Sequence, residues 1–271
     1  MRTFEFQPNK ETDALAVAYL HSPMVEVPNY RTVRPCIVVI PGGGYGMCSM
    51  READPVAFEY FTAGFQVILL KQYSVKEKAV DFNPLKDISL TIMKIRENAK
   101  EWGVDEDKIA VCGFSAGGHL AASIGTMWNH PRLLEKLDTK DGMNRPNAMI
   151  LCYPVIRADE YAHEGSIRNV SGAEPGTAEY CFWAMENHVS SDTCPAFLWH
   201  TGGDVSVPVE NSLAMVNALQ SHHIPYEFHV LPGGYHGMSV CTVETNSKDV
   251  YTSRWMELSK MWLYRVFEFE K

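Results

Sequence analysis

Residues 113–117 read Gly-Phe-Ser-Ala-Gly, and this stretch decides the fold. An apolar run at 108–112 precedes it, and a helix-like run at 118–128 follows it. A serine flanked by glycines two positions away on each side, at a strand-to-helix turn, is typical of a nucleophile elbow. The turn is so sharp that larger residues at the glycine positions would clash, and its strained backbone lifts the serine Oγ out of the sheet. We therefore expect Ser115 to be a nucleophile rather than part of an ordinary glycine-rich turn.

Apolar runs and amphipathic runs alternate on both sides of this stretch. Strands are expected at 14–20, 36–40, 67–70, 109–112, 148–153, 196–200 and 226–231. Helices are expected between them, at 54–63, 84–102, 118–128, 209–222 and 249–269. Short, continuously apolar strands that alternate with helices predict an α/β fold, with a mainly parallel sheet covered on both faces. No repeat or linker interrupts the pattern, so we expect a single domain over residues 1–271.

The segment at about 157–192 breaks the alternation. It is polar and contains several glycines, and an aromatic cluster follows them. We expect a short cap-like insertion over the site rather than a disordered surface loop, because aromatic residues are rare in disordered loops. Four aromatic or imidazole side chains are expected to line the substrate pocket. They are Tyr45, Tyr180, Trp183 and His188.

A serine nucleophile needs a histidine base, and the histidine needs a carboxylate to orient it. Asp204 follows the expected strand 196–200 directly, and His236 follows the expected strand 226–231. Both lie on glycine-rich loops, and the order Ser, Asp, His is the one this chemistry uses after an elbow of this kind. The sequence therefore predicts a triad of Ser115, Asp204 and His236. His119, in the helix after the elbow, is expected to be structural.

A tetrahedral intermediate also needs N–H donors for its oxyanion. The residue after the nucleophile supplies one of them, which here is Ala116. The loop 41–45, Pro-Gly-Gly-Gly-Tyr, follows an expected strand and can offer backbone N–H groups without obstruction by side chains. Such a loop could also bind a phosphate, but no Gly-Lys-Ser/Thr follows it, so the oxyanion role is favoured.

Composition excludes several functional classes. The formal net charge of -9 argues against a nucleic-acid surface, and no apolar run is long enough to span a membrane. The first residues lack the apolar core of a signal peptide. Seven cysteines without a C-x-x-C pair favour reduced thiols, and we expect a cytoplasmic protein. No metal-binding motif is present, so neither a metal nor another cofactor is expected.

These motifs together resemble the α/β-hydrolase esterases, in particular the hormone-sensitive-lipase-like and acetyl-xylan-esterase-like (carbohydrate esterase) branch. The resemblance runs from about residue 15 onward, and six segments carry it: 41–45, 51–54, 98–102, 113–120, 199–211 and 235–237. It implies an eight-stranded, mostly parallel sheet and ester hydrolysis without a cofactor. By position it also implies that Gly43 and Gly44 are the loop donors beside Ala116. Pro41 stands where the lipase-like branch has histidine, which points to the xylan-esterase-like branch and leaves open how the loop is braced.

The expected function is hydrolysis of short-acyl carboxylic esters by the serine triad, with acetylated sugars or oligosaccharides as candidate small-molecule substrates. An amidase or peptidase activity is the first alternative, because a triad alone does not distinguish esters from amides. A non-catalytic binding module is the second alternative, although such modules often lose a triad member. The sequence leaves open the acyl group, the alcohol part and whether the protein is a monomer or a homo-oligomer.

Overall fold

The computed structural model describes residues 1–270, and its apolar runs pair into one eight-stranded sheet. In chain order the strands are β1 (Arg2–Phe6), β2 (Leu15–Leu20), β3 (Arg34–Ile40), β4 (Gln66–Gln72), β5 (Val104–Phe114), β6 (Ala148–Cys152), β7 (Ala196–Thr201) and β8 (Tyr226–Leu231). Their order across the sheet is β1-β2-β4-β3-β5-β6-β7-β8. β2 is antiparallel to both of its neighbours, and every other pair is parallel.

The expected α/β class, with a mostly parallel eight-stranded sheet, is confirmed. The apolar runs of the sequence do not predict β1, because its residues, Arg-Thr-Phe-Glu-Phe, are half polar. β1 lies at the edge of the sheet, where only one face is buried. The helix expected at 84–102 is two helices, α2 (Asn83–Glu97) and α3 (Ala99–Trp102), because the backbone leaves the helical conformation at Asn98. The other expected elements form within a few residues of their predicted bounds.

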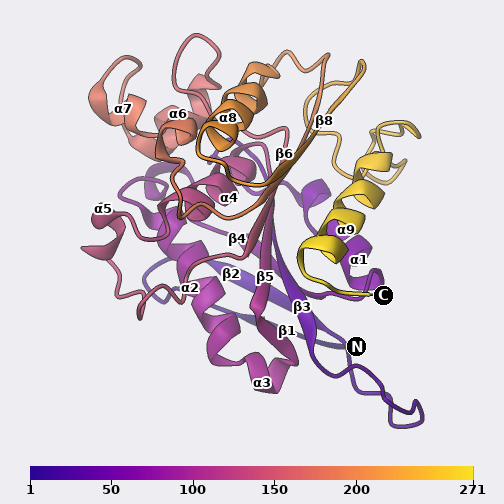
Figure 1. Ribbon diagram of the computed structural model, residues 1–271. Helices are drawn as coiled ribbons and strands as arrows, with labels where there is room; N and C mark the ends of the chain where they lie inside the picture. The colour runs from indigo at the N-terminus through magenta and orange to yellow at the C-terminus, as the bar shows by residue number, and fades with distance from the viewer. Residues whose placement is uncertain (271) are drawn as a thin grey trace.

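Helices cover the two faces of the sheet (Figure 1). α1 (Asp54–Thr62) and α9 (Arg254–Val266) pack on one face, while α2, α4 (Ala116–Met127) and α8 (Glu210–Ser221) pack on the other. Four short elements, α5 (Pro131–Leu134), α6 (Glu164–Ser171), α7 (Ala178–Phe182) and the 3-10 turn η3 (Met185–His188), complete the region between β5 and β7. α6, α7 and α8 lie together at one end of the sheet (Figure 1).

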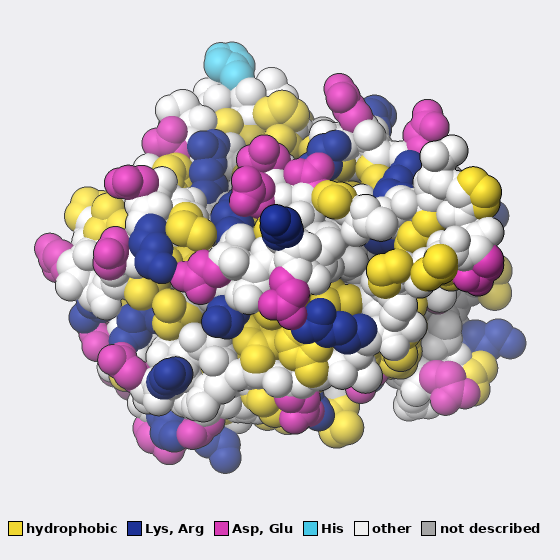
Figure 2. All heavy atoms as spheres, turned by 90° about the horizontal axis from the view of Figure 1, so that it is seen from below, with side chains coloured by type: hydrophobic (Ala, Val, Ile, Leu, Met, Phe, Trp, Pro, Cys, Tyr) yellow, Lys and Arg dark blue, Asp and Glu magenta, His cyan; other side chains and the backbone are white. Residues whose placement is uncertain are grey.

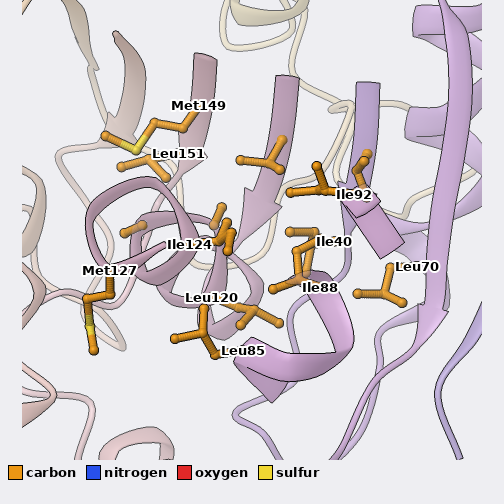
Figure 3. Close-up of a cluster of buried hydrophobic side chains, with 14 of the residues drawn as sticks. Ile40, Leu70, Leu85, Ile88, Ile92, Leu120, Ile124, Met127, Met149 and Leu151 are labelled. Atoms are coloured by element: carbon orange, nitrogen blue, oxygen red, sulfur yellow. The ribbon is translucent and has the colours of Figure 1, made fainter. Parts of the chain in front are cut away.

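Strand side chains divide between two apolar cores. In β3, Ile37 and Val39 point to the α1/α9 face, and Val38 and Ile40 point to the α2/α4 face. All four are completely buried. Figure 3 shows the second core, where Ile40 packs with side chains of α2 and α4. Because both faces are covered, the central strands contain continuous apolar runs rather than alternating polar and apolar residues.

The surface and the cysteines are consistent with the composition. Acidic and basic side chains are interspersed on the face seen in Figure 2. Among residues 1–270, no helix has the length and apolarity that a bilayer crossing requires. All seven cysteines are free thiols, and five of them are buried.

Candidate active site

Ser115 occupies the turn between β5 and α4, with φ of 54° and ψ of -117°. A positive φ is rare for a non-glycine residue and stores strain, so neighbouring contacts must hold it. Three backbone hydrogen bonds do so. The Ser115 N–H donates to Cys152 O at 3.0 Å, and the Ser115 carbonyl accepts from His119 N at 3.0 Å and Val155 N at 3.1 Å. The elbow is therefore tied to the end of β6 as well as to its own helix.

Two glycines let the backbone of the elbow pack closely. A Cβ on Gly113 would lie 2.0 Å from Gly117 O, and one on Gly117 would lie 2.3 Å from Ile40 O. Distances this short are not compatible with any side chain, because the atoms they meet belong to the backbone. Close backbone packing therefore explains why positions 113 and 117 are glycine.

Ser115, His236 and Asp204 meet at the carboxyl ends of β5, β8 and β7. His236 Nε2 lies 2.8 Å from Ser115 Oγ, and His236 Nδ1 lies 2.6 Å from Asp204 Oδ2. Since a carboxylate can only accept, Nδ1–H donates to Asp204, and Nε2 is left to accept the serine proton. The Asp204 side chain is fully buried, whereas that of His236 is 22% exposed. The arrangement is the one expected for proton transfer between serine and histidine.

Asp204 is held as an anion. Burial raises the pKa of its carboxyl, but the His200 and His236 imidazoles and the Val207 N–H outweigh burial, and the net pKa lies well below the usual range. Its second oxygen, Oδ1, accepts from Ser206 N at 3.0 Å and Val207 N at 2.9 Å. These bonds orient the carboxylate toward His236.

The three expected oxyanion donors have no other partner. Gly43 and Gly44 line the same cavity as Ser115, and Ala116 is the first residue of α4. Within residues 1–270, none of their N–H groups donates a hydrogen bond to the protein. Gly43 has φ of 125°, and a Cβ there would lie 2.3 Å from Met47 O, so only glycine fits. Free donors beside a nucleophile can receive an oxyanion.

Glu52 holds the glycine-rich loop 41–45, which has proline rather than histidine at position 41. This carboxylate is 3% exposed, and its Oε2 accepts from Gly42 N at 2.9 Å. Its Oε1 accepts from Tyr153 Oη at 2.7 Å, and Tyr153 Oη accepts from Ser239 N at 2.9 Å. The chain of bonds therefore joins the loop that contains Gly43 to the loop that contains His236.

Tyr153 has a second contact with the site. Its ring lies 5.2 Å from the His236 ring, centroid to centroid, at an angle of 70°. Its backbone has φ of 37°, a rare conformation for a bulky residue. Strain at this position places the ring against His236 and the hydroxyl against Glu52 at once.

The four expected pocket residues, Tyr45, Tyr180, Trp183 and His188, do not line the cavity at Ser115, and this expectation is corrected. Tyr45 is buried and its hydroxyl lies 2.7 Å from His119 Nδ1. Tyr180 of α7 and Trp183, which follows α7, are buried in the core, and His188 Nε2 donates to Phe182 O at 2.6 Å. Large aromatic side chains bury more apolar area in such a core than at an open polar cavity. The aromatic cluster of the segment 157–192 therefore contributes to the apolar core, not to the wall of the cavity.

The cavity itself has a volume of about 370 Å³. Besides the glycines and the two expected catalytic residues, it is lined by Met47, Ser49, Arg51, Glu52 and His163. His163 precedes α6, and its Nδ1 lies 2.9 Å from Ser166 Oγ. Burial lowers the pKa of His163, and the nearby His236 lowers it further. None of these residues carried a chemical motif in the sequence, although 51 and 52 lie in a segment that contributed to the family resemblance.

Within residues 1–270 no group of three or more His, Cys, Asp or Glu side chains is placed to hold a metal ion. A larger groove, of about 520 Å³, lies near Arg96 and Arg145, away from these residues. The convergent polar groups mark the smaller cavity as the candidate site.

The sheet order, the elbow after β5 and the acid and histidine after β7 and β8 define the α/β-hydrolase fold. A solved acetyl ester-xyloside bifunctional hydrolase from Caldicellulosiruptor lactoaceticus superposes with a TM-score of 0.81 at 34% identity. The match covers 98% of this chain and 92% of that one.

The BD-FAE family model matches residues 25–219, and the chain belongs to the BD-FAE family. Endo-1,4-beta-xylanase B of Butyrivibrio fibrisolvens is 36% identical over 234 residues, which are 84% of this chain and 35% of the relative. An acetylxylan esterase of Xylanibacter ruminicola is 29% identical over 76% of this chain and 41% of the relative. The chain thus spans about a third to two fifths of the length of these curated relatives.

Proposed function

We propose that this protein is a serine esterase that removes short acyl groups, acetyl above all, from small hydroxylated substrates such as sugars. One observation carries the proposal. Ser115 Oγ, His236 and Asp204 form a continuous chain, with distances of 2.8 and 2.6 Å, beside backbone N–H groups that donate to no atom of residues 1–270. Two similar proteins, the acetylxylan esterase of Xylanibacter ruminicola and the acetyl ester-xyloside bifunctional hydrolase of Caldicellulosiruptor lactoaceticus, support the ester class and the acetyl group.

The proposed reaction begins at Ser115. His236 Nε2 accepts the hydroxyl proton as Oγ attacks the ester carbonyl, and Asp204 stabilises the imidazolium that results. The N–H groups of Gly43, Gly44 and Ala116 receive the negative charge on the carbonyl oxygen. His236 then gives its proton to the departing alcohol, which leaves an acyl group on Ser115. A water molecule, activated by His236, releases the acid and restores the serine.

The size of the cavity supports a short acyl group. A volume of about 370 Å³ is near the lower end of the range for small-molecule sites, and the proposed oxyanion loop and His163, directly before α6, bound it. Asn169 of α6 donates to Gly44 O at 2.8 Å, which ties the segment 157–192 to the oxyanion loop. We propose that this segment is a cap-like insertion within a single domain.

Replacing the nucleophile tests the mechanism. We expect Ser115→Ala to lower kcat on p-nitrophenyl acetate by about five to six orders of magnitude, because the serine and histidine act as a unit. A fluorophosphonate probe should label the wild type at Ser115 and leave the variant unlabelled. Wild-type turnover by the folded Ser115→Ala variant would overturn the mechanism. Faster cleavage of an N-acetyl amide than of the matched acetyl ester would favour an amidase instead.

A further inference from the structure

Arg51 brings a positive charge to the cavity that the proposed reaction does not use. Its side chain is exposed and lines the cavity with Ser49, Ser115 and His236. Within residues 1–270, its guanidinium forms no ion pair and donates no hydrogen bond to the protein. Its carbonyl oxygen, by contrast, accepts from Ser239 Oγ at 2.6 Å. The backbone is therefore anchored while the cationic group is left free.

The neighbours of Arg51 fix where that charge lies. Arg51 belongs to the 3-10 turn η1 (Met50–Glu52), and the next residue, Glu52, is buried and bonded to two other groups. A Cβ built on Gly237 would lie 2.5 Å from Arg51 Nη2. The guanidinium thus packs directly against the residue after His236, and it occupies the space that a side chain at position 237 would fill.

This position corresponds to the alcohol side of the proposed substrate. His236 must pass its proton to the departing alcohol oxygen, so the alcohol part of an ester lies next to His236 when it leaves. Arg51, in contact with Gly237, borders the same space. Among the residues that line the cavity in the described part of the chain, it is the one with a permanent positive charge, since the lowered pKa of His163 keeps that imidazole neutral near pH 7.

Glu52 lines this region and Asp204 lies behind His236, and neither takes up the Arg51 charge. Both oxygens of Glu52 are engaged, one by Gly42 N and the other by Tyr153 Oη. Asp204 is engaged by His236 and by the backbone of its own loop. The guanidinium is therefore free to receive an anion from outside the protein.

We propose that Arg51 binds a carboxylate on the alcohol part of the ester, so that acetylated acidic sugars, such as acetylated uronic acids, are preferred substrates. This inference rests on the proposed esterase function. A guanidinium presents a planar pair of donors that matches the two oxygens of a carboxylate, and charge-assisted bonds of this kind are stronger than neutral ones. The sugar hydroxyls would face the polar residues of the same cavity, such as Ser49.

The test uses two acetylated sugars that differ in one group. Methyl glucuronoside and methyl glucoside, acetylated at the same hydroxyl, carry a carboxylate and a hydroxymethyl group respectively. We expect wild-type kcat/KM to be about tenfold higher for the acidic sugar, a preference that falls as salt is added. Arg51→Gln should abolish the preference. Arg51→Lys should retain part of it, because lysine keeps the charge but loses the planar donors.

Arg254→Gln is the matched control. Arg254 is exposed and outside the cavity, with its guanidinium 5.1 Å from the centroid of the Tyr251 ring. Its replacement changes the net charge by the same amount, so it should leave the ratio of the two kcat/KM values unchanged.

Three results would overturn the proposal: equal wild-type rates on the two sugars, an unchanged ratio in Arg51→Gln, or an equal loss of preference in Arg254→Gln. Faster hydrolysis of an acetylated sugar phosphate than of the uronate would overturn the assignment of carboxylate. If neither sugar nor p-nitrophenyl acetate is hydrolysed at all, the esterase function itself fails, which is a different outcome from hydrolysis without preference.

Discussion

The nucleophile elbow and the loops that face it across the cavity are held in place by different means. At the elbow, backbone packs on backbone, with Gly117 in contact with the carbonyls of Ile40 and Pro41. Across the cavity, side chains provide the support, through Glu52 and Tyr153. The glycines that the elbow requires lie within five consecutive residues, and the groups they meet are backbone atoms that any sequence supplies. The facing loops instead require two particular side chains, Glu52 and Tyr153, which are separated by 101 positions. Catalytic geometry of this kind needs both local and long-range determinants.

Filling the space at the elbow should have the largest effect. A Cβ at position 117 would lie 2.3 and 2.4 Å from two backbone oxygens that cannot move independently of β3. We expect Gly117→Ala to lower the free energy of unfolding by at least about 3 kcal/mol, or to prevent soluble accumulation. Urea denaturation measures the change.

Gly202→Ala is the control for this variant. Gly202 is exposed, and a Cβ there would meet only Leu231 O at 3.8 Å, so the change should stay within about 0.5 kcal/mol. Similar stabilities for the two variants would contradict the view that close backbone packing holds the elbow.

Removing the support on the opposite side should reduce catalysis more than stability. Glu52→Ala leaves Gly42 N–H and Tyr153 O–H without an acceptor, so the loop of the proposed oxyanion donors is free to shift. We expect kcat on p-nitrophenyl acetate to fall about a hundredfold with little change in KM, comparable to the loss of one oxyanion donor. Glu52→Gln keeps one carbonyl oxygen and should fall only about tenfold.

Active-site titration distinguishes positioning from unfolding in the Glu52 variants. Fluorophosphonate labelling counts the molecules with a reactive Ser115, and kcat is then expressed per labelled site. A kcat per labelled site equal to that of the wild type would show that Glu52 contributes only to stability. That result would contradict the view that Glu52 positions the loop opposite the elbow.

A smaller effect, on the pH dependence of stability, is expected at His119, where the helix after the elbow contacts the loop 41–45. His119 of α4 is fully buried; Nε2–H donates to Trp183 O at 2.9 Å, and Nδ1 accepts from Tyr45 Oη of the loop 41–45 at 2.7 Å. Burial lowers the His119 pKa to about 4, and the nearby His188 adds to the shift. Between pH 6.5 and about 4 the unfolded chain therefore binds a proton that the folded chain does not, so stability falls as pH falls through this window.

His119→Gln should remove this dependence, because glutamine does not titrate and can retain a donor for Trp183 O. Between pH 7 and pH 4.5 the wild type should lose about 2 kcal/mol more of its unfolding free energy than the variant does. Urea titrations at the two pH values provide the comparison. Parallel losses in the two proteins would indicate that His119 is not the group responsible.

The sequence predicted what depends on local pattern. The strand runs, the elbow at 113–117 and the post-strand positions of Asp204 and His236 follow from burial on both sheet faces and from the order of loops along the chain. It did not predict the contacts that join distant segments. Nothing in the residue types at 52 and 153 indicates that they bond, because a buried carboxylate is recognised only once its partners are in place.

The aromatic residues of the segment 157–192 are a second case in which the sequence did not predict long-range packing. Tyr180 and Trp183 were expected to line the pocket, yet composition alone does not distinguish a binding surface from a small core. Their burial was decided by the packing of that segment against Phe82 and α4, which no local pattern encodes. The sequence also did not predict that Arg51 lines the cavity, because an isolated arginine is ordinarily a solvated surface residue.

The contact between Gly117 and Pro41 has a consequence for how such a protein can diversify. Pro41 begins the loop of the proposed oxyanion donors, and Gly117 belongs to the turn that carries Ser115, so van der Waals contact between the two segments sets the spacing from nucleophile to donors. The segment 157–192 bonds to this loop through Asn169 and Gly44 O, but the contact between Gly117 and Pro41 involves none of its residues. Insertions and substitutions there can accumulate over evolutionary time and alter which alcohols are accepted, while the reacting atoms keep the same separation.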